Sequence, residues 1–99
     1  MTVALVEVDI AIVAEAERAS KLIGGDVEND SGERIGTIDD LMLVGDRVSF
    51  AVLSVGGFLG LTSKRVAISF DDLQIDGESV VLPDATREEL KRLPEFRYR

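Results

Sequence analysis

Two alternating apolar segments joined by a glycine-rich loop occupy residues 47–73, and this pattern constrains the fold more than any other part of the chain. Apolar and polar residues alternate over 47–55 and again over 65–70, which is the period of a half-buried β-strand. The loop between them carries three glycines, which can adopt backbone conformations that a Cβ forbids. This part of the chain therefore predicts two neighbouring antiparallel strands.

Further short strands follow from turn signals that recur about every eight to twelve residues. The other predicted strands cover 26–29, 35–44, 73–75 and 79–82, with turns at 29–33, 45–46 and 76–77. The alternation slips near Asp39-Asp40-Leu41, which predicts a β-bulge. We expect a mainly β fold, a small antiparallel barrel of about six strands.

The C-terminal region changes from strand to helix pattern. Thr86-Arg87-Glu88-Glu89 matches a capping box, which predicts a helix through about Leu93 that ends before Pro94. The aromatic side chains Phe96 and Tyr98 follow, and we expect them to cover an open end of the barrel or to contact a partner.

The first 18 residues stand apart from the rest. Val6, Val8, Ile10 and Ile12 alternate with acidic or small residues, which predicts a strand over 3–13, and 14–19 is predicted helical or turn-like. A lone strand must pair with something, either an edge of its own domain or a second copy of the chain. We therefore divide the chain into an N-terminal arm, residues 1–18, and one domain, residues 19–99.

Composition excludes several classes of function. The chain has 99 residues, a net charge of −8, no cysteine and no histidine. It can form no disulfide, thiolate nucleophile or cysteine-ligated metal centre, and the acidic balance disfavours direct nucleic-acid binding. It shows neither a secretory signal pattern nor an apolar run long enough to cross a membrane, so we expect a cytoplasmic protein without membrane insertion.

No catalytic, cofactor or metal site is predicted. The pairs Asp39-Asp40 and Asp71-Asp72 are the close carboxylates, but adjacent strand residues point to opposite faces, so neither pair converges on a cation. The glycine loop leads into a strand, whereas a phosphate-binding loop leads into a helix. Without histidine, the serines lack their usual general base.

The residues 20–44 resemble the opening of a PRC-barrel domain. In that family an Ile-Gly pair precedes a short strand, a Gly-Glu-x-Ile-Gly hairpin and an Ile-x-Asp-Leu strand; these correspond here to Ile23-Gly24, Gly32–Gly36 and Ile38–Leu41. The segment 55–73 and the ending 84–98 are also similar to members of the family, so the likeness covers about 19–98.

The resemblance implies a six-stranded domain that docks onto other macromolecules and does not catalyse a reaction. Such domains occur in the cytoplasmic part of the photosynthetic reaction-centre H subunit and in the ribosome-maturation factor RimM. These 99 residues contain neither the membrane helix of the first nor the separate N-terminal domain of the second. A non-enzymatic docking module is the leading hypothesis; a ribosome-assembly role through a ribosomal protein, or regulation of a photosynthetic complex, are the alternatives.

Two sets of residues are candidates for partner binding. The glycine loop offers Phe58 and Leu59, which either pack over the barrel mouth or anchor a partner. We expect a homodimer and an unidentified protein partner. The full candidate set is Gly56, Gly57, Phe58, Leu59, Gly60, Leu61, Val6, Val8, Ile10 and Ile12.

Overall fold

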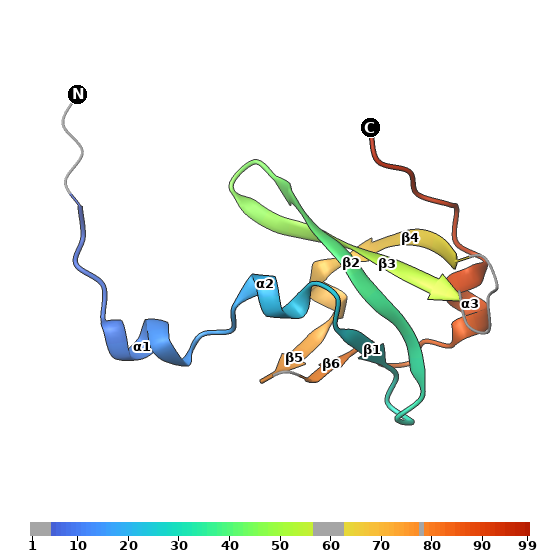
Figure 1. Cartoon of the computed structure of the whole chain (residues 1–99), viewed down its shortest axis with the longest axis horizontal. Helices are drawn as coiled ribbons and strands as arrows, with labels where there is room; N and C mark the ends of the chain where they lie inside the picture. The colour runs from blue at the N-terminus through green and yellow to red at the C-terminus, as the bar shows by residue number, and fades with distance from the viewer. Residues whose placement is uncertain (1–4, 57–62, 78) are drawn as a thin grey trace.

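The computed structural model describes residues 5–56, 63–77 and 79–99. The elements in chain order are α1 (Ile10–Glu15), α2 (Ala19–Leu22), β1 (Asp26–Glu28), β2 (Arg34–Val44), β3 (Arg47–Gly56), β4 (Ser63–Ser69), the 3-10 turn η2 (Phe70–Asp72), β5 (Gln74–Asp76), β6 (Ser79–Val81) and α3 (Arg87–Lys91) (Figure 1).

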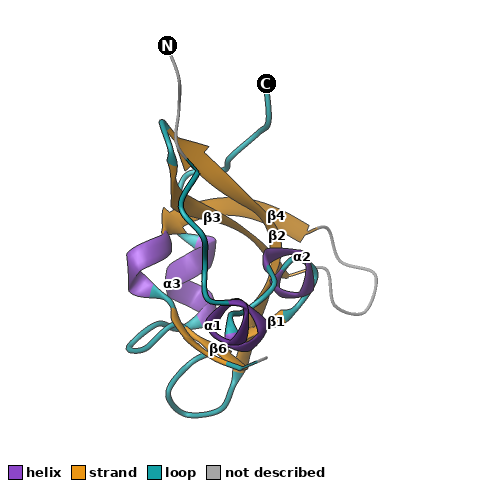
Figure 2. Ribbon diagram, turned by 90° about the vertical axis from the view of Figure 1, so that its left-hand side faces the viewer, coloured by secondary structure: helices purple, strands orange, loops and turns teal. Residues whose placement is uncertain are grey.

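The six strands form one curved sheet in the order β4-β3-β2-β1-β6-β5 (Figure 2). All neighbours are antiparallel except β1 and β6, which pair in parallel through Glu28 and Val81. The mainly β, six-stranded fold with one short C-terminal helix is confirmed. The barrel is not closed in the described part of the chain, because β4 and β5 end the sheet and are not paired with each other.

The turns lie where the sequence predicts them. Gly32 and Gly45 close the two hairpins around β2 with φ of +79° and +64°, a region that favours glycine. The ladder between β2 and β3 shifts register between Ile38 and Asp40, which confirms the predicted bulge. The bulge leaves Asp39 outside the ladder, and its carboxylate bonds to side chains from β4 and the C-terminal tail.

The core is aliphatic and lies between the sheet and α3. It includes Val27, Ile35, Ile38 and Leu53, each at most 1% exposed, and α3 adds Leu90. Burying such side chains stabilises the fold by roughly 1.5–3 kcal/mol each. The capping box is confirmed at the start of α3, where the Thr86 hydroxyl oxygen accepts from the Glu89 N–H at 3.1 Å.

Gly36 is required by a close approach of backbones. A Cβ at this position would lie 2.8 Å from the carbonyl oxygen of Ser54 on β3. We expect Gly36→Ala to lower the free energy of unfolding by about 2 kcal/mol, because the strands must separate to accept the methyl group. Chemical denaturation measures this loss. Gly32→Asn is the control, since Gly32 faces open space and asparagine tolerates positive φ; an equal loss in both variants would contradict the steric explanation.

The strand predicted over 3–13 is wrong for the part of it that the structure describes. Residues 5–9 have no regular secondary structure, and Ile10–Glu15 form the helix α1. The Asp9 carboxylate accepts from the Ala11 N–H at 3.0 Å and caps this helix. A helix satisfies its backbone polar groups internally, whereas a strand needs a partner strand, and no strand of the described chain lies beside the arm.

Candidate interaction surfaces

The N-terminal arm exposes a continuous set of large apolar side chains. The exposed fractions are 95% for Leu5, 85% for Val6, 59% for Val8, 72% for Ile10, 67% for Ile12 and 54% for Val13. Residues 5–16 extend away from the domain (Figure 1), and α1 buries none of its residues. The radius of gyration is 15.9 Å, against about 13 Å for a compact domain of this length. The arm is thus an apolar segment that the described domain does not cover.

The helix α1 is too short and too apolar to be stable by itself in water. It has six residues, and the sequence IAIVAE places apolar side chains around most of its circumference. Isolated helices shorter than about 12–15 residues are marginal in water, and a helix that is apolar all round is normally buried. We therefore expect α1 to be buried against a partner. The candidate residues of the arm are accessible for this, because all four are exposed: Val6, Val8, Ile10 and Ile12.

The tip of the β2–β3 hairpin, residues 43–47, is a second exposed apolar surface. Leu43 is 64% exposed and Val44 is 60% exposed, and they pair across the hairpin with Val48 and Arg47. This surface was not predicted from the sequence. Its signal was present, because two apolar residues directly before a Gly-Asp turn break the alternation of a half-buried strand.

The glycine loop lies mostly outside the described residues. Gly56 ends β3 with φ of +86° and is half-buried, which agrees with the backbone freedom expected of a glycine there. Residues Gly57, Phe58, Leu59, Gly60 and Leu61 belong to the part of the chain that the structure does not describe. Their role in partner binding stays a prediction.

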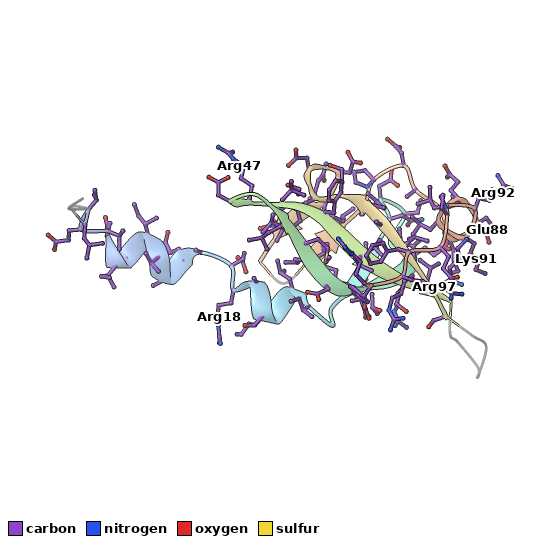
Figure 3. The ribbon with its side chains drawn as sticks, turned by 90° about the horizontal axis from the view of Figure 1, so that it is seen from above. Arg18, Arg47, Glu88, Lys91, Arg92 and Arg97 are labelled. Atoms are coloured by element: carbon purple, nitrogen blue, oxygen red, sulfur yellow. The ribbon has the colours of Figure 1, made fainter. Side chains whose placement is uncertain are left out.

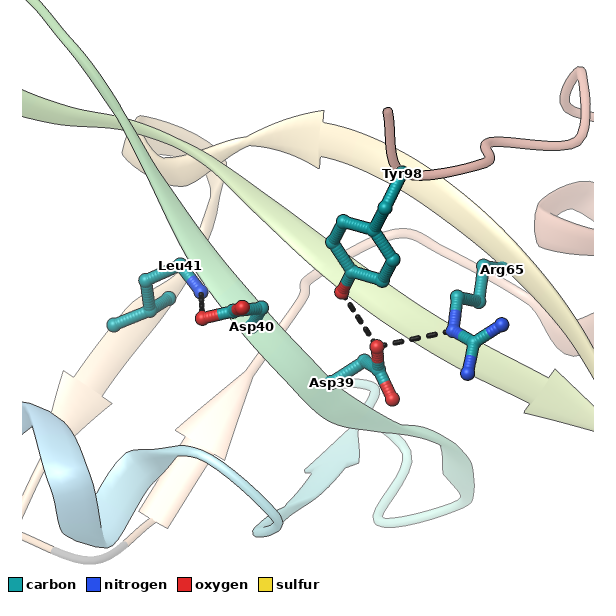
Figure 4. A network of polar contacts seen from close by, with 5 residues as sticks. All are labelled: Asp39, Asp40, Leu41, Arg65 and Tyr98. Carbon is teal, nitrogen blue, oxygen red and sulfur yellow. Dashed lines mark hydrogen bonds and ion pairs between the residues drawn. The ribbon is translucent and has the colours of Figure 1, made fainter.

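The C-terminal tail is attached to the outer face of the sheet by a polar network (Figure 4). The Tyr98 hydroxyl donates to Asp39 Oδ2 at 2.5 Å, and Arg65 Nε donates to the same oxygen at 3.0 Å. The Arg65 guanidinium lies 5.6 Å from the Tyr98 ring centroid, and the Phe96 N–H donates to the Arg65 carbonyl oxygen at 2.8 Å. The expectation that these aromatic residues cover a barrel end is wrong, because the tail crosses β4 and reaches the bulge in β2.

This network changes two pKa values in opposite directions. The hydrogen bond from Tyr98, with the charge and hydrogen bond of Arg65, holds the pKa of Asp39 below 3.8. Burial, then the hydrogen bond to the Asp39 carboxylate, raises the pKa of Tyr98 from 10.0 to about 12. The Asp39 contribution to stability is therefore present above 3.8 and is lost as pH falls through its lowered pKa. The Tyr98 contribution is present below 10.0 and is lost as pH rises to about 12.

Tyr98 is the single tyrosine of the chain, so its ionisation can be measured directly. We expect its near-ultraviolet absorbance to titrate with a pKa of about 12 in the folded protein and of 10.0 in denaturant. Asp39→Asn removes the anionic acceptor and should lower the pKa of the folded protein part of the way toward 10.0. A folded protein that titrates at the ordinary value would contradict the network.

The acidic pairs remain apart. Asp39 faces Tyr98 and Arg65, whereas the Asp40 carboxylate accepts from the Leu41 N–H at 2.8 Å (Figure 4). Asp71 and Asp72 lie exposed in η2. Within the described ranges there is no group of three or more acidic side chains that could hold a metal ion, and no pocket is detected. The described residues therefore offer surfaces and no enclosed reaction site.

Comparison with known proteins agrees with this architecture. The family model described as PRC-barrel domain matches residues 14–90, which is most of the chain. Comparison with curated proteins gives no match. In the part of the chain with assigned structure, every helix is too short or too polar to cross a bilayer.

Proposed function

Since the chain belongs to the PRC-barrel family, we propose that it is a non-catalytic protein-interaction module that forms a homodimer through its N-terminal arm. The observation that carries this proposal is the exposure of six large apolar side chains between Leu5 and Val13. A soluble monomer rarely exposes a continuous apolar patch of this kind unless the patch is an interaction site.

The energetics favour association. Complete burial of an aliphatic side chain stabilises by roughly 1.5–3 kcal/mol, so six that are on average about 70% exposed offer roughly 6–13 kcal/mol per arm. Association costs about 4–15 kcal/mol in lost freedom of motion. A two-fold interface buries two arms, one from each copy. The stabilisation from apolar burial is therefore obtained twice, whereas the free-energy cost of association is incurred once.

The chemistry of the chain supports the absence of catalysis. The sequence has no histidine and no cysteine, which removes the commonest general base and the most nucleophilic side chain. The perturbed groups, Asp39 and Tyr98, hold each other in a structural network. Because their hydrogen bonds attach the tail to the sheet, these two side chains are not available to bind a substrate.

Deletion of residues 1–18 tests the proposal. The remaining chain should fold, because no residue from 5 to 18 is buried and the arm's hydrogen bonds are local. We expect the mass in solution, measured by sedimentation equilibrium, to fall from that of a dimer to that of a monomer. At concentrations where the intact chain is also monomeric, the two chains should unfold with the same transition. An intact chain that is already monomeric, or a truncated chain that remains dimeric, would contradict the proposal.

A further inference from the structure

The exposed apolar residues of the described chain gather at one end of the molecule. The arm and the hairpin tip extend toward the same side of the domain (Figure 1). Among the described residues, the exposed large apolar side chains outside these two groups are Ile23, Phe50 and Tyr98. One end of the molecule thus presents a combined apolar surface made of the arm and the hairpin tip.

The size of this surface suits a dimer. The transfer energy of an aliphatic side chain corresponds to about 60–120 Å² of area, so the eight side chains of the arm and the tip offer about 500 Å² of apolar area per copy. A standard interface buries about 800 Å² per partner, of which a little over half is apolar. The arm alone supplies about three-quarters of the estimated area, so the hairpin tip is needed to complete it.

The charges at this end are complementary. The arm carries four acidic side chains, Glu7, Asp9, Glu15 and Glu17. Arg18 and Arg47 lie at the same end (Figure 3), and the side chain of Arg47 is 86% exposed. The nearest acid to Arg47 is Asp46 at 3.8 Å, a long contact between two exposed groups that contributes little. An acidic arm therefore has a cation available beside the apolar tip.

A contact by side chains fits the tip better than strand addition. At the root of the projecting hairpin, the Leu41 N–H is already taken by the Asp40 carboxylate at 2.8 Å. A backbone donor that is satisfied in this way is not available to an added strand. The apolar side chains of Leu43 and Val44 remain exposed and available.

We propose that α1 of one copy packs on the β2–β3 hairpin tip of a second copy, and that the two-fold axis repeats this contact in the opposite sense. The inference rests on the proposed homodimer and adds the receptor surface, Leu43, Val44 and Arg47. In such an interface arm and tip are different surfaces, so each copy contributes one of each to two identical contacts.

A mixing experiment with two full-length variants tests this arrangement. The arm variant is Ile10→Ser/Ile12→Ser/Val13→Ser, and the tip variant is Leu43→Thr/Val44→Thr, in which threonine keeps the strand preference. We expect each variant alone to be monomeric at a concentration where the natural chain is dimeric. Mixed in equal amounts, they should form a heterodimer, because the intact arm of one meets the intact tip of the other. Its affinity should be lower than that of the natural dimer, since one of two contacts is lost.

The outcomes separate the two proposals. If the arms pair with each other, the tip variant alone stays dimeric and mixing recovers nothing, which overturns this inference and leaves the homodimer standing. If the natural chain is monomeric, both proposals fail. Arg47→Glu, which reverses the charge and keeps Leu43 and Val44 in place, should weaken dimerisation several-fold. Unchanged dimerisation in both tip variants, with unfolding midpoints equal to that of the natural chain, also overturns the inference.

Discussion

Replacing Ile10, Ile12 and Val13 by serine in the full-length chain should raise the dissociation constant of the dimer at least about 100-fold. The three side chains are 72%, 67% and 54% exposed, so the interface would lose roughly 3–6 kcal/mol of apolar burial per copy. A loss of 2.7 kcal/mol already corresponds to 100-fold. Sedimentation equilibrium over a concentration series measures the change.

The same substitution should leave the fold of the domain intact. None of the three residues is buried, and serine, isoleucine and valine have similar helix propensities. The free energy of unfolding at concentrations where the chain is monomeric should therefore stay within about 0.5 kcal/mol.

The double variant Ala11→Ser/Ala14→Ser is the matched control. It places serines in the same helix but removes no side-chain carbon, because each alanine methyl only gains a hydroxyl group. We expect its dissociation constant to change less than tenfold. If the control weakens the dimer as much as the triple variant does, the apolar surface of α1 is not what holds the two copies together.

Asn29→Ala should show the opposite pattern, a loss of stability of about 3 kcal/mol with association preserved. Asn29 is 7% exposed and its amide makes three hydrogen bonds. Its Oδ1 accepts from the N–H groups of Ser31 and Glu33 at 3.1 and 2.9 Å, and its Nδ2 donates to the Ala85 carbonyl oxygen at 3.1 Å. Alanine would leave these partly buried backbone groups without their partner.

The bond from Asn29 to Ala85 joins residues 56 positions apart, so its loss should also loosen the attachment of α3. Thermal unfolding measures the effect, and Ser31→Ala is the control, because it removes an exposed hydroxyl beside the same loop and should change stability by less than about 0.5 kcal/mol. An Asn29→Ala variant as stable as the control would show that water replaces the amide at no cost.

The sequence was most informative where the physics is local. The Gly32 and Gly45 turns, the capping box of Thr86 and Glu89 and the bulge near Asp39 all depend on residues within a few positions of one another. Steric limits on positive φ and short-range hydrogen bonds act in the same way in any context, so the hairpins and α3 could be predicted with their positions nearly correct.

The arm was predicted incorrectly because its pattern supports two structures. Val6, Val8, Ile10 and Ile12 alternate as a strand does, yet Ile10–Glu15 also form an apolar turn of helix that Asp9 can cap. A strand requires a neighbour to satisfy its backbone, and the described domain supplies none at that place. The choice between strand and helix was therefore decided by what lies beside the arm and not by the arm's own residues.

What the sequence by itself determined is the class of fold, its turns and an aliphatic core without a reactive residue. Only the tertiary structure decided which distant groups meet: Asp39, Arg65 and Tyr98, separated by 26 and 59 positions, and the exposure of the hairpin tip at the same end as the arm. Local preferences act over a few residues and can be seen in the order of the chain. Contacts between distant residues depend on how the sheet curves and where it stays open. Both are set by the packing of all the strands together and not by any one segment.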